Sequence, residues 1–243
     1  MNQFDEAAAT YDEVAESDLG RALRARVHDR LRPLICSGDV VLDVGAGTGI
    51  DAAMYAGWGA SVTALEPSIA MARIARGRAA DRVEVAVESL ESWAGADDAF
   101  DVVVSNFGAL NCVPDLQPAI DRLVGACRPG GHIVLVVMGR CAPWEVAGGI
   151  RHRDGDRIRR RTRGHAGEVS YWSPRAVSRA MGERAQLVVV ESLGWALPTF
   201  AQRQVVDGRP RTLRALAWLD RAMARPLGRI GVGDHWIGRW TRR

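Results

Sequence analysis

The sequence predicts an α/β fold in which helices cover both faces of a parallel sheet. Three observations lead to this prediction. From residue 40 onward, short apolar segments of strand length alternate with segments of helical periodicity. A glycine-rich loop at residues 45–49 separates the first apolar segment from the helix after it. An acidic residue, Glu66, ends the next apolar segment, 21 residues after Gly45.

The individual elements follow from periodicity and from turn residues. Residues 5–32 have helical spacing, with a break expected at Gly20 and an end at Pro33. Strands are predicted at about residues 40–44, 61–65, 83–87, 100–105 and 132–137, helices at 50–57, 67–76 and 115–126, and a turn at 128–131. The second half is less regular. It predicts a pair of short strands within 139–170, a helix at 173–181, a strand at 185–192 and a helix at 210–224.

Composition limits the class of protein. A chain of 243 residues with 47% hydrophobic and 25% charged residues is ordinary for a soluble globular enzyme. No window approaches 18 apolar residues, and the acidic N-terminus lacks the pattern of a signal peptide, so we expect a cytoplasmic protein that does not enter a membrane. Its four cysteines are too far apart for a zinc site or a disulfide framework, so no metal is expected.

The charge is mild overall but uneven. The net charge is +3, and all 32 basic residues are arginine, which suggests the codon bias of a GC-rich genome. Seven of these arginines lie in residues 151–163. This segment is either a solvated hairpin or an anion-binding patch for an acidic substrate, a carrier protein or a nucleic acid.

The glycine-rich loop carries the strongest functional signal. A strand, a glycine-rich turn and a helix with free backbone N–H groups form the usual nucleotide-binding unit. The spacing of Gly45, Gly47 and Gly49 differs from the dinucleotide fingerprint, and three glycines alone also fit an ordinary tight turn. A carboxylate at Glu66 is placed to accept hydrogen bonds from ribose hydroxyls, the alternative being a solvated acid at a strand end.

Together these segments resemble the class I S-adenosylmethionine (SAM) methyltransferases, the broad group that includes the quinone, biotin-pathway and natural-product enzymes. The resemblance covers residues 1 to about 138 well and 173–192 loosely. It is carried by residues 4–12, 43–49, 66–68 with Met71, 100–110 and 128–131. It implies one domain, 1–243, with a Rossmann-like, seven-stranded, mostly parallel sheet between helices. A helical lid at 1–33, a substrate-side insertion at 139–172 and a helical extension at 200–243 would surround this sheet. The seventh strand would be antiparallel, and residues 186–200 suit a final hairpin.

The resemblance also implies a cofactor site for SAM, with S-adenosylhomocysteine as the product. The residues expected at this site are Tyr11, Asp43, Gly45, Ala46, Gly47, Gly49, Glu66, Pro67, Met71, Ser89, Leu90, Asn106 and Phe107. One segment departs from the pattern, because many relatives have Gly-Asp-Ala where this chain has Glu88, Ser89 and Leu90. Ser89 retains one hydrogen-bonding group for the adenine, and Leu90 can pack on its face.

The acceptor side is less clearly marked. A general base is needed only if the acceptor loses a proton. The candidates are His28, His152 and His165, whereas His132 has the setting of a structural residue and His235 lies in a C-terminal segment of unassigned placement. Tyr11 is expected to pack over the cofactor. Asn111, Trp144 and Trp172 are candidates for the substrate pocket, although Asn111 also fits a turn and the tryptophans also fit a core.

We therefore expect a methyltransferase that acts on a small-molecule, natural-product acceptor. Direct in-line displacement would move the methyl group to an oxygen or nitrogen, with carbon as a further option. A carrier-bound or macromolecular acceptor is the first alternative, and a SAM-binding fold repurposed as a cyclase or isomerase is the second. Asn106 is not followed by the prolines of nucleic-acid N-methyltransferases, which disfavours nucleic acid. The sequence leaves the acceptor and the choice between monomer and homodimer open.

Overall fold

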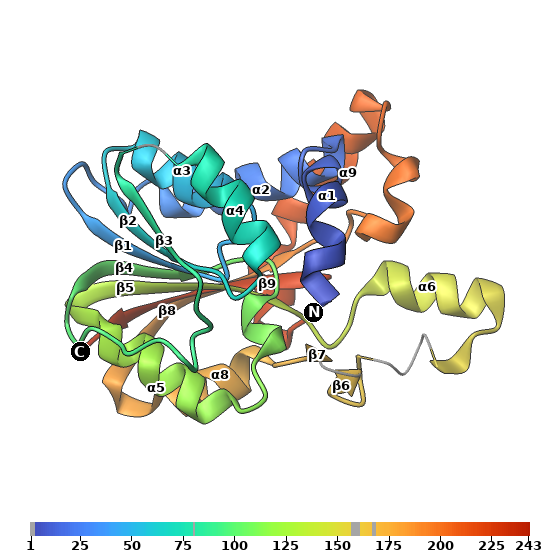
Figure 1. Cartoon of the computed structure of the whole chain (residues 1–243). Coiled ribbons are helices and arrows are strands. Elements are labelled where there is room, and N and C mark those ends of the chain that lie inside the picture. Colours follow the sequence, from blue (N-terminus) through green and yellow to red (C-terminus); the bar gives the residue numbers. More distant parts are fainter. Residues whose placement is uncertain (1–2, 80, 157–160, 167–168) are drawn as a thin grey trace.

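The computed structural model describes residues 3–79, 81–156, 161–166 and 169–243. It confirms the α/β class, with one seven-stranded sheet in the order β3-β2-β1-β4-β5-β9-β8 (Figure 1). Neighbouring strands are parallel except that β9 runs antiparallel to both β5 and β8. The strands of this sheet are β1 Val40–Val44, β2 Ser61–Leu65, β3 Val83–Ala86, β4 Phe100–Ser105, β5 Cys127–Met138, β8 Ala185–Leu193 and β9 His235–Arg242.

Helices cover both faces of the sheet (Figure 1). One face packs against α2 Asp18–Leu31, α3 Ile50–Gly57, α4 Ile69–Arg78 and α9 Pro210–Ala222. The opposite face packs against α5 Leu116–Ala126 and α8 Pro174–Met181. A further helix, α10 Ala224–Ile230, packs closely on β8, where a Cβ on Gly228 would lie 2.6 Å from the Cα of Glu191. None of the described helices is long and apolar enough to cross a membrane.

The carboxyl ends of the parallel strands form the edge of the sheet at which ligands bind in such folds. Several elements gather beyond this edge (Figure 1). They are α1 Gln3–Ala15, the short helix η1 Ala109–Cys112, α6 Pro143–His152, and the paired short strands β6 His165–Ala166 and β7 Val169–Ser170. Two more short helices, η2 Gly182–Arg184 and η3 Phe200–Val205, connect the later elements.

Side-chain caps explain why several helices begin where the sequence predicts. The hydroxyls of Ser68 and Ser173 and the carboxylate of Asp115 each accept a hydrogen bond from a backbone N–H in the first turn of the following helix. The predicted turn at residues 128–131 lies within β5, as an irregularity where the pairing with β4 shifts register.

The expected helix break at Gly20 was wrong. The chain turns at residues 16–17, where the hydroxyl of Ser17 accepts a hydrogen bond from the N–H of Gly20 at 3.1 Å. Gly20 lies in the first turn of α2. A Cβ there would approach the carbonyl oxygen of Ala15 to 2.4 Å, so the glycine allows the end of α1 to pack against α2.

The expected hairpin at residues 186–200 was also wrong. Residues 185–193 do form a strand, β8, but its antiparallel partner is β9, which follows α9 and α10. The segment expected to be a helical extension, 200–243, therefore ends in a strand. Within β9, the buried rings of Trp236 and Trp240 pack edge to face, with centroids 6.2 Å apart. A Cβ on Gly238 would lie 2.3 Å from the ring of Trp240, so only glycine fits between them.

Candidate functional site

The glycine-rich loop has the backbone conformation that its sequence requires. Gly45, Gly47 and Gly49 have φ angles of 73°, 57° and 77°, in the left-handed region that favours glycine. There is also no room for a side chain at Gly45, since a Cβ there would lie 2.2 Å from the Cβ of Ala109. The loop therefore lets the backbone pass close to η1 and turns the chain from β1 into α3.

Glu66 holds this loop in place. Its carboxylate accepts hydrogen bonds from the backbone N–H groups of Gly47 and Ser68, both at 2.8 Å. Burial raises the pKa of Glu66, outweighing these two hydrogen bonds, which lower it. Each carboxylate oxygen can accept more than one hydrogen bond, so both retain capacity for the hydroxyls of a ribose.

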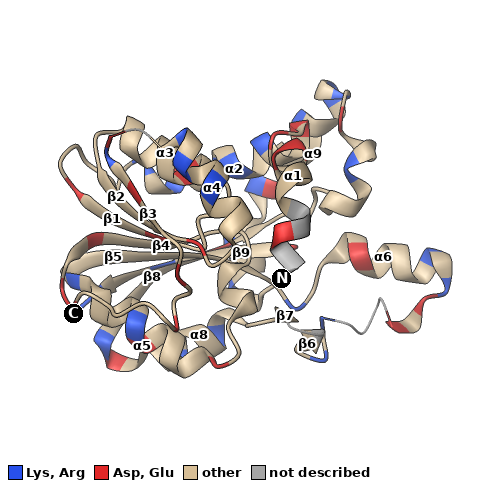
Figure 2. Cartoon of the chain, in the orientation of Figure 1, with Lys and Arg blue, Asp and Glu red and all other residues tan. Residues whose placement is uncertain are grey.

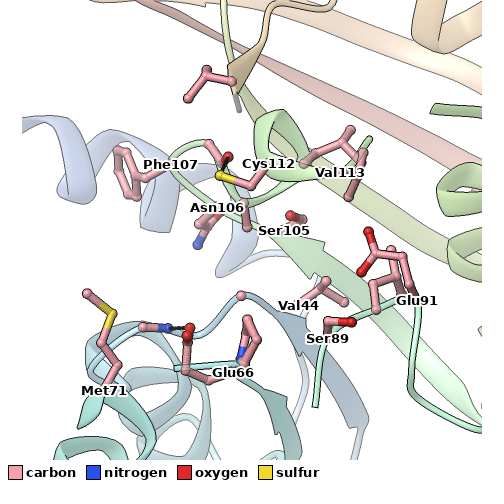
Figure 3. A pocket seen from close by; sticks show the side chains of 18 of the residues that line it. Val44, Glu66, Met71, Ser89, Glu91, Ser105, Asn106, Phe107, Cys112 and Val113 are labelled. Carbon is pink, nitrogen blue, oxygen red and sulfur yellow. Dashed lines mark hydrogen bonds between the residues drawn. The ribbon is translucent and has the colours of Figure 1, made fainter. Parts of the chain in front are cut away.

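A cavity of about 470 Å³ opens beside the loop. Figure 3 shows Glu66 and Met71 on one side of it, Asn106, Phe107 and Cys112 on the opposite side, and Ser89 and Glu91 at one end. The structure places all of the expected cofactor residues on its wall except Asp43, Ala46 and Gly49. Both Ser89 and Leu90, from the segment that departs from the family pattern, line the cavity.

A buried charged network lies beneath this cavity, and its centre, Asp51, was missed in the sequence. Asp51 forms an ion pair with Arg24, and its other oxygen lies 2.7 Å from Nε2 of His28. The amide of Asn106 donates to Asp51 at 3.0 Å and to the hydroxyl of Tyr55 at 2.8 Å. Burial opposes the charge of Asp51, but Arg24 and His28 outweigh it and hold its pKa at about 2. An acid in the first turn of α3 resembles an ordinary helix-start residue, so only the fold reveals its partners.

Asp43 has the opposite environment. It is 1% exposed, and its Oδ2 has no hydrogen-bond partner in the part of the chain that the structure describes. Burial and the nearby charge of Asp51 raise the pKa of Asp43 well above its usual value, and the charge of Arg24 only partly offsets this. Asp43 therefore takes up a proton far more readily than Asp51.

A second cavity, of about 580 Å³, adjoins the first. The two cavities share Tyr11, Phe107 and Met138 on their walls. Phe107 has a φ of 46°, an unusual backbone conformation for a bulky residue. Its ring lies between Arg24, whose Cζ is 4.8 Å from the ring centroid, and His235, whose ring centroid is 5.8 Å away. Strain of this kind is typical of residues held in a functional site.

A chain of charged groups lines the second cavity, and no pattern in the sequence predicts it. Nδ1 of His235 lies 3.1 Å from Oδ2 of Asp234, although the ring nitrogen is not aligned for a hydrogen bond. Arg161 contacts Oδ1 of Asp234 and Oε2 of Glu145, both at 2.7 Å. Burial opposes the charge of Asp234, but His235 and Arg161 hold its pKa at about 2.

The histidines expected as base candidates lie outside both cavities. His28 packs against the rings of Tyr55 and Trp58, with centroid distances of 6.4 and 5.7 Å, while its Nε2 contacts Asp51. His152, in the last turn of α6, and His165, in β6, are exposed. The histidine that does line the second cavity is His235, at the start of β9.

The expected substrate residues lie next to the cavities rather than on their walls. Asn111 is fully buried, and its amide group donates to Ser170 at 2.6 Å and accepts from the N–H of Met138 at 2.8 Å. The indole N–H of Trp144 donates to Ala196 and that of Trp172 to Leu110. These contacts fasten β7, α6 and η1 to the body of the molecule.

The arginine-rich segment divides into two parts. Arg161 points inward to the second cavity, whereas Arg151, Arg153 and Arg163 are exposed. Residues 157–160, which contain the remaining three arginines, lie outside the described residues. In the described part of the chain, no group of three or more His, Cys, Asp or Glu side chains is arranged to hold a metal ion, and no disulfide joins any of the four cysteines.

Comparisons with known proteins agree with this geometry. Residues 41–131 match a family described as "Methyltransferase domain". The demethylmenaquinone methyltransferase of Clavibacter sepedonicus is 34% identical over 140 residues, which is 54% of this chain and 55% of that protein. The malonyl-[acyl-carrier protein] O-methyltransferase of Serratia marcescens is 31% identical over 156 residues, 63% of this chain and 58% of that protein. The chain thus spans somewhat more than half the length of these curated relatives.

Solved structures extend the likeness of the fold to nearly the whole chain. An S-adenosylmethionine-dependent methyltransferase from Mesorhizobium loti superposes with a TM-score of 0.62 at 21% identity, covering 94% of this chain and 100% of that one. The sheet order, the glycine-rich loop and these matches lead to one conclusion. Residues 41–131 resemble a methyltransferase domain, and the chain has the fold of the Mesorhizobium loti S-adenosylmethionine-dependent methyltransferase.

Proposed function

We propose that this protein is an enzyme that transfers a methyl group from SAM to a small molecule bound in the second cavity. The observation that carries the proposal is the junction of the two cavities at Tyr11, Phe107 and Met138. A methyl donor in one cavity and an acceptor in the other would meet at this junction. Holding two reactants about 3 Å apart and in line can supply several kcal/mol of the barrier.

The residues of the first cavity suit the donor. The turn at Gly45 and Gly47 brings the backbone close to the ligand, and Glu66 offers carboxylate oxygens to the ribose hydroxyls. Ser89 and Leu90 lie where a polar contact and an apolar face for the adenine would be needed. When bound, the donor supplies a sulfonium-activated methyl group, so the protein's main tasks are to orient the acceptor and to exclude water.

The second cavity suits a small acceptor with an apolar body and a polar group. Val14, Phe107 and Phe200 give it apolar walls, and its volume of about 580 Å³ is within the usual range for small-molecule sites. The charged groups gather around His235. This arrangement favours an acceptor whose nucleophilic atom carries a proton, such as a hydroxyl, because a base is then close to the junction.

We propose that His235 accepts the proton of the acceptor. The bound donor would supply the methyl carbon for a new bond to the hydroxyl oxygen, and the electron pair of the broken carbon–sulfur bond would stay on the sulfur. The hydroxyl proton passes to the imidazole of His235, which becomes an imidazolium and later returns the proton to solvent. The adjacent carboxylate of Asp234, held by Arg161, stabilises that positive charge.

A carrier-bound acceptor is the second candidate. The exposed arginines Arg151, Arg153 and Arg163 flank Glu145 and Arg161, which line the second cavity. The Serratia relative acts on a malonyl group attached to an acyl carrier protein, according to its name. Replacing these three exposed arginines with glutamine separates the candidates, since only turnover of an acidic carrier would then fall and lose its salt dependence.

The test is turnover with a labelled donor. Purified protein is incubated with methyl-deuterated SAM and a panel of phenols, naphthols, amines and hydroxy acids, and the products are read by mass spectrometry. The proposal predicts that an acceptor gains one labelled methyl group while S-adenosylhomocysteine forms. Binding of the donor with an acceptor rearranged but not methylated would instead support a cyclase or isomerase.

The role of His235 has its own prediction. His235→Gln is expected to lower kcat for a hydroxyl acceptor by about 100-fold or more while KM changes little, because only the proton transfer is lost. Asp234→Asn should lower kcat and shift its dependence on pH. His152→Gln is the matched control, because that exposed histidine lies outside both cavities. Equal losses in the His152 and His235 variants would contradict this assignment.

A further inference from the structure

A third hollow, of about 900 Å³, lies at the edge of the sheet and shares no residue with the two cavities of the proposed methyl-transfer site. Its walls come from the end of α2, the outer side of α8, α10, and the strands β8 and β9. Since β8 is the last strand of the sheet, no further strand among the described residues covers this edge. We call the hollow the edge groove.

Arginines dominate the edge groove. Six of them, from four elements, line it: Arg30, Arg175, Arg179, Arg225, Arg229 and Arg239. Among the described residues, two carboxylates, Asp29 and Glu191, face the same space. Figure 2 shows basic residues on α2 and α8, two of the helices whose residues line the groove. The lining therefore has an excess of four positive charges, although the chain as a whole has a net charge of only +3.

The two carboxylates are already engaged. Glu191 is 4% exposed and binds Arg30 at 2.6 Å and Arg225 at 3.3 Å. Asp29 lies 3.3 Å from Arg221, outside the groove. The remaining four arginines of the lining form no ion pair with any carboxylate in the part of the chain that the structure describes. The groove thus presents four guanidinium groups that no carboxylate in the described part of the chain neutralises.

Of these four arginines, Arg239 gives the strongest indication that a ligand binds here. It lies on β9, between Val134 of β5 and Val189 of β8, so its stem is fixed by the sheet. Its Nε is buried and has no hydrogen-bond partner among the described residues. A buried polar atom without a partner costs free energy, and a ligand with acceptor oxygens would relieve that cost.

The groove also has an apolar side. Leu187 and Val188 of β8 are 43% and 46% exposed, which is unusual for large aliphatic side chains on a sheet edge. Leu34 continues this surface from the segment after α2. Charged and apolar surfaces therefore lie side by side within one hollow of small-molecule size.

We propose that the edge groove binds an amphiphilic phosphate ester, with its phosphate or diphosphate head on the arginines and its apolar body on Leu187 and Val188. Guanidinium groups match the oxygens of phosphate with paired, charge-assisted hydrogen bonds. A head with several oxygens is needed to reach arginines on α8, α10 and β9 at once. A second copy of this chain is disfavoured, because each copy would present the same positive surface to the other.

The test is calorimetry at low ionic strength with two probes, inorganic pyrophosphate and octyl phosphate. Octyl phosphate is expected to bind one site per chain, and both probes are expected to bind more weakly at physiological salt. Arg179→Gln and Arg239→Gln should each lower the affinity for both probes by about tenfold or more. Val188→Thr should weaken octyl phosphate alone. Arg211→Gln, which removes an exposed arginine of α9 outside the groove, is the matched control.

Three results would overturn the proposal. The first is that octyl phosphate fails to bind to the wild-type protein. The second is that the groove variants bind it as well as Arg211→Gln does. The third is that the protein sediments as a dimer, which Val188→Asp converts to monomers. Arg179 is exposed on α8, so its variant remains informative if Arg239→Gln fails to fold. Binding of SAM should be unchanged in Arg179→Gln, so this outcome is independent of the proposed methyl transfer.

Discussion

At the residue scale, two buried aspartates near the first cavity show how the environment of a carboxyl group decides its charge. Asp51 is surrounded by Arg24, His28 and Asn106, and its pKa is held at about 2. Because this pKa lies below that of an unfolded aspartate, near 4, Asp51 stabilises the fold above that pH. The contribution is lost as the pH falls toward 2. Asp234 likewise stabilises the fold in its charged form, because His235 and Arg161 hold its pKa below that of an unfolded aspartate.

Asp43 leads to a prediction of the opposite sign. Its folded-state pKa is raised, so the group destabilises the fold as the pH rises above the unfolded pKa near 4. Asp43→Asn removes the ionisable group. It should increase the free energy of unfolding of the ligand-free protein at pH 7 by about 1–3 kcal/mol. Urea denaturation at several pH values measures this change.

The control for this prediction is Asp81→Asn, since Asp81 is exposed. The gain in the free energy of unfolding from Asp43→Asn should shrink as the pH is lowered toward 4. There, Asp43 of the wild-type protein is protonated more fully in both the folded and the unfolded state. A stability gain that stays the same from pH 7 to pH 4, or that also occurs in Asp81→Asn, would show that the cause is not the ionisation of Asp43.

At the element scale, the β1–α3 loop depends on the close approach of its backbone at Gly45 to Ala109, which leaves no room for a side chain. Gly45→Ala would place a Cβ 2.2 Å from that of Ala109 and would force a φ of 73° on an alanine. The expected loss in the free energy of unfolding is roughly 2–4 kcal/mol, and SAM binding should be lost as the loop moves. Chemical denaturation and calorimetry read the two effects.

The matched control is Gly57→Ala in the last turn of α3. A Cβ there meets no heavy atom within 4 Å, and the residue is helical. Alanine is the better helix former, so this variant should be as stable as the wild type or slightly more stable. If Gly45→Ala behaved like Gly57→Ala, the loop would not have the tight packing described above.

Local patterns predicted most elements, and distant pairing explains the failures. β4 and α8 begin and end where apolar runs and a Ser-Pro start predict, because those signals lie within the element itself. The partner of β8 is separated from it in the chain by α9 and α10, so periodicity alone favoured a neighbouring hairpin. Gly20 was interpreted as a break because its role, contact with the end of α1, is visible only in three dimensions.

At the scale of the whole molecule, the two halves of the candidate site differ in how far the sequence predicts them. The first cavity is built mainly from contiguous motifs around Gly45, Glu66 and Asn106, which a single sequence can reveal. The second cavity joins α1, α2, α6, residue 161, η3 and the start of β9. Its charged chain therefore comes from positions more than 70 residues apart, as in the pair of Arg161 and Asp234. No local pattern marks such residues.

The central claim is that the first cavity holds SAM, and isothermal titration calorimetry tests it most directly. Wild-type protein should bind SAM and S-adenosylhomocysteine at one site per chain. Glu66→Ala should lower the affinity for both ligands by at least about tenfold, because hydrogen bonds to a charged group each contribute about 1.5–3 kcal/mol. Glu84→Ala, on β3 and outside the cavity, should bind as the wild type does. Absence of binding to the folded wild-type protein, or equal affinity in the Glu66 variant, would contradict the account.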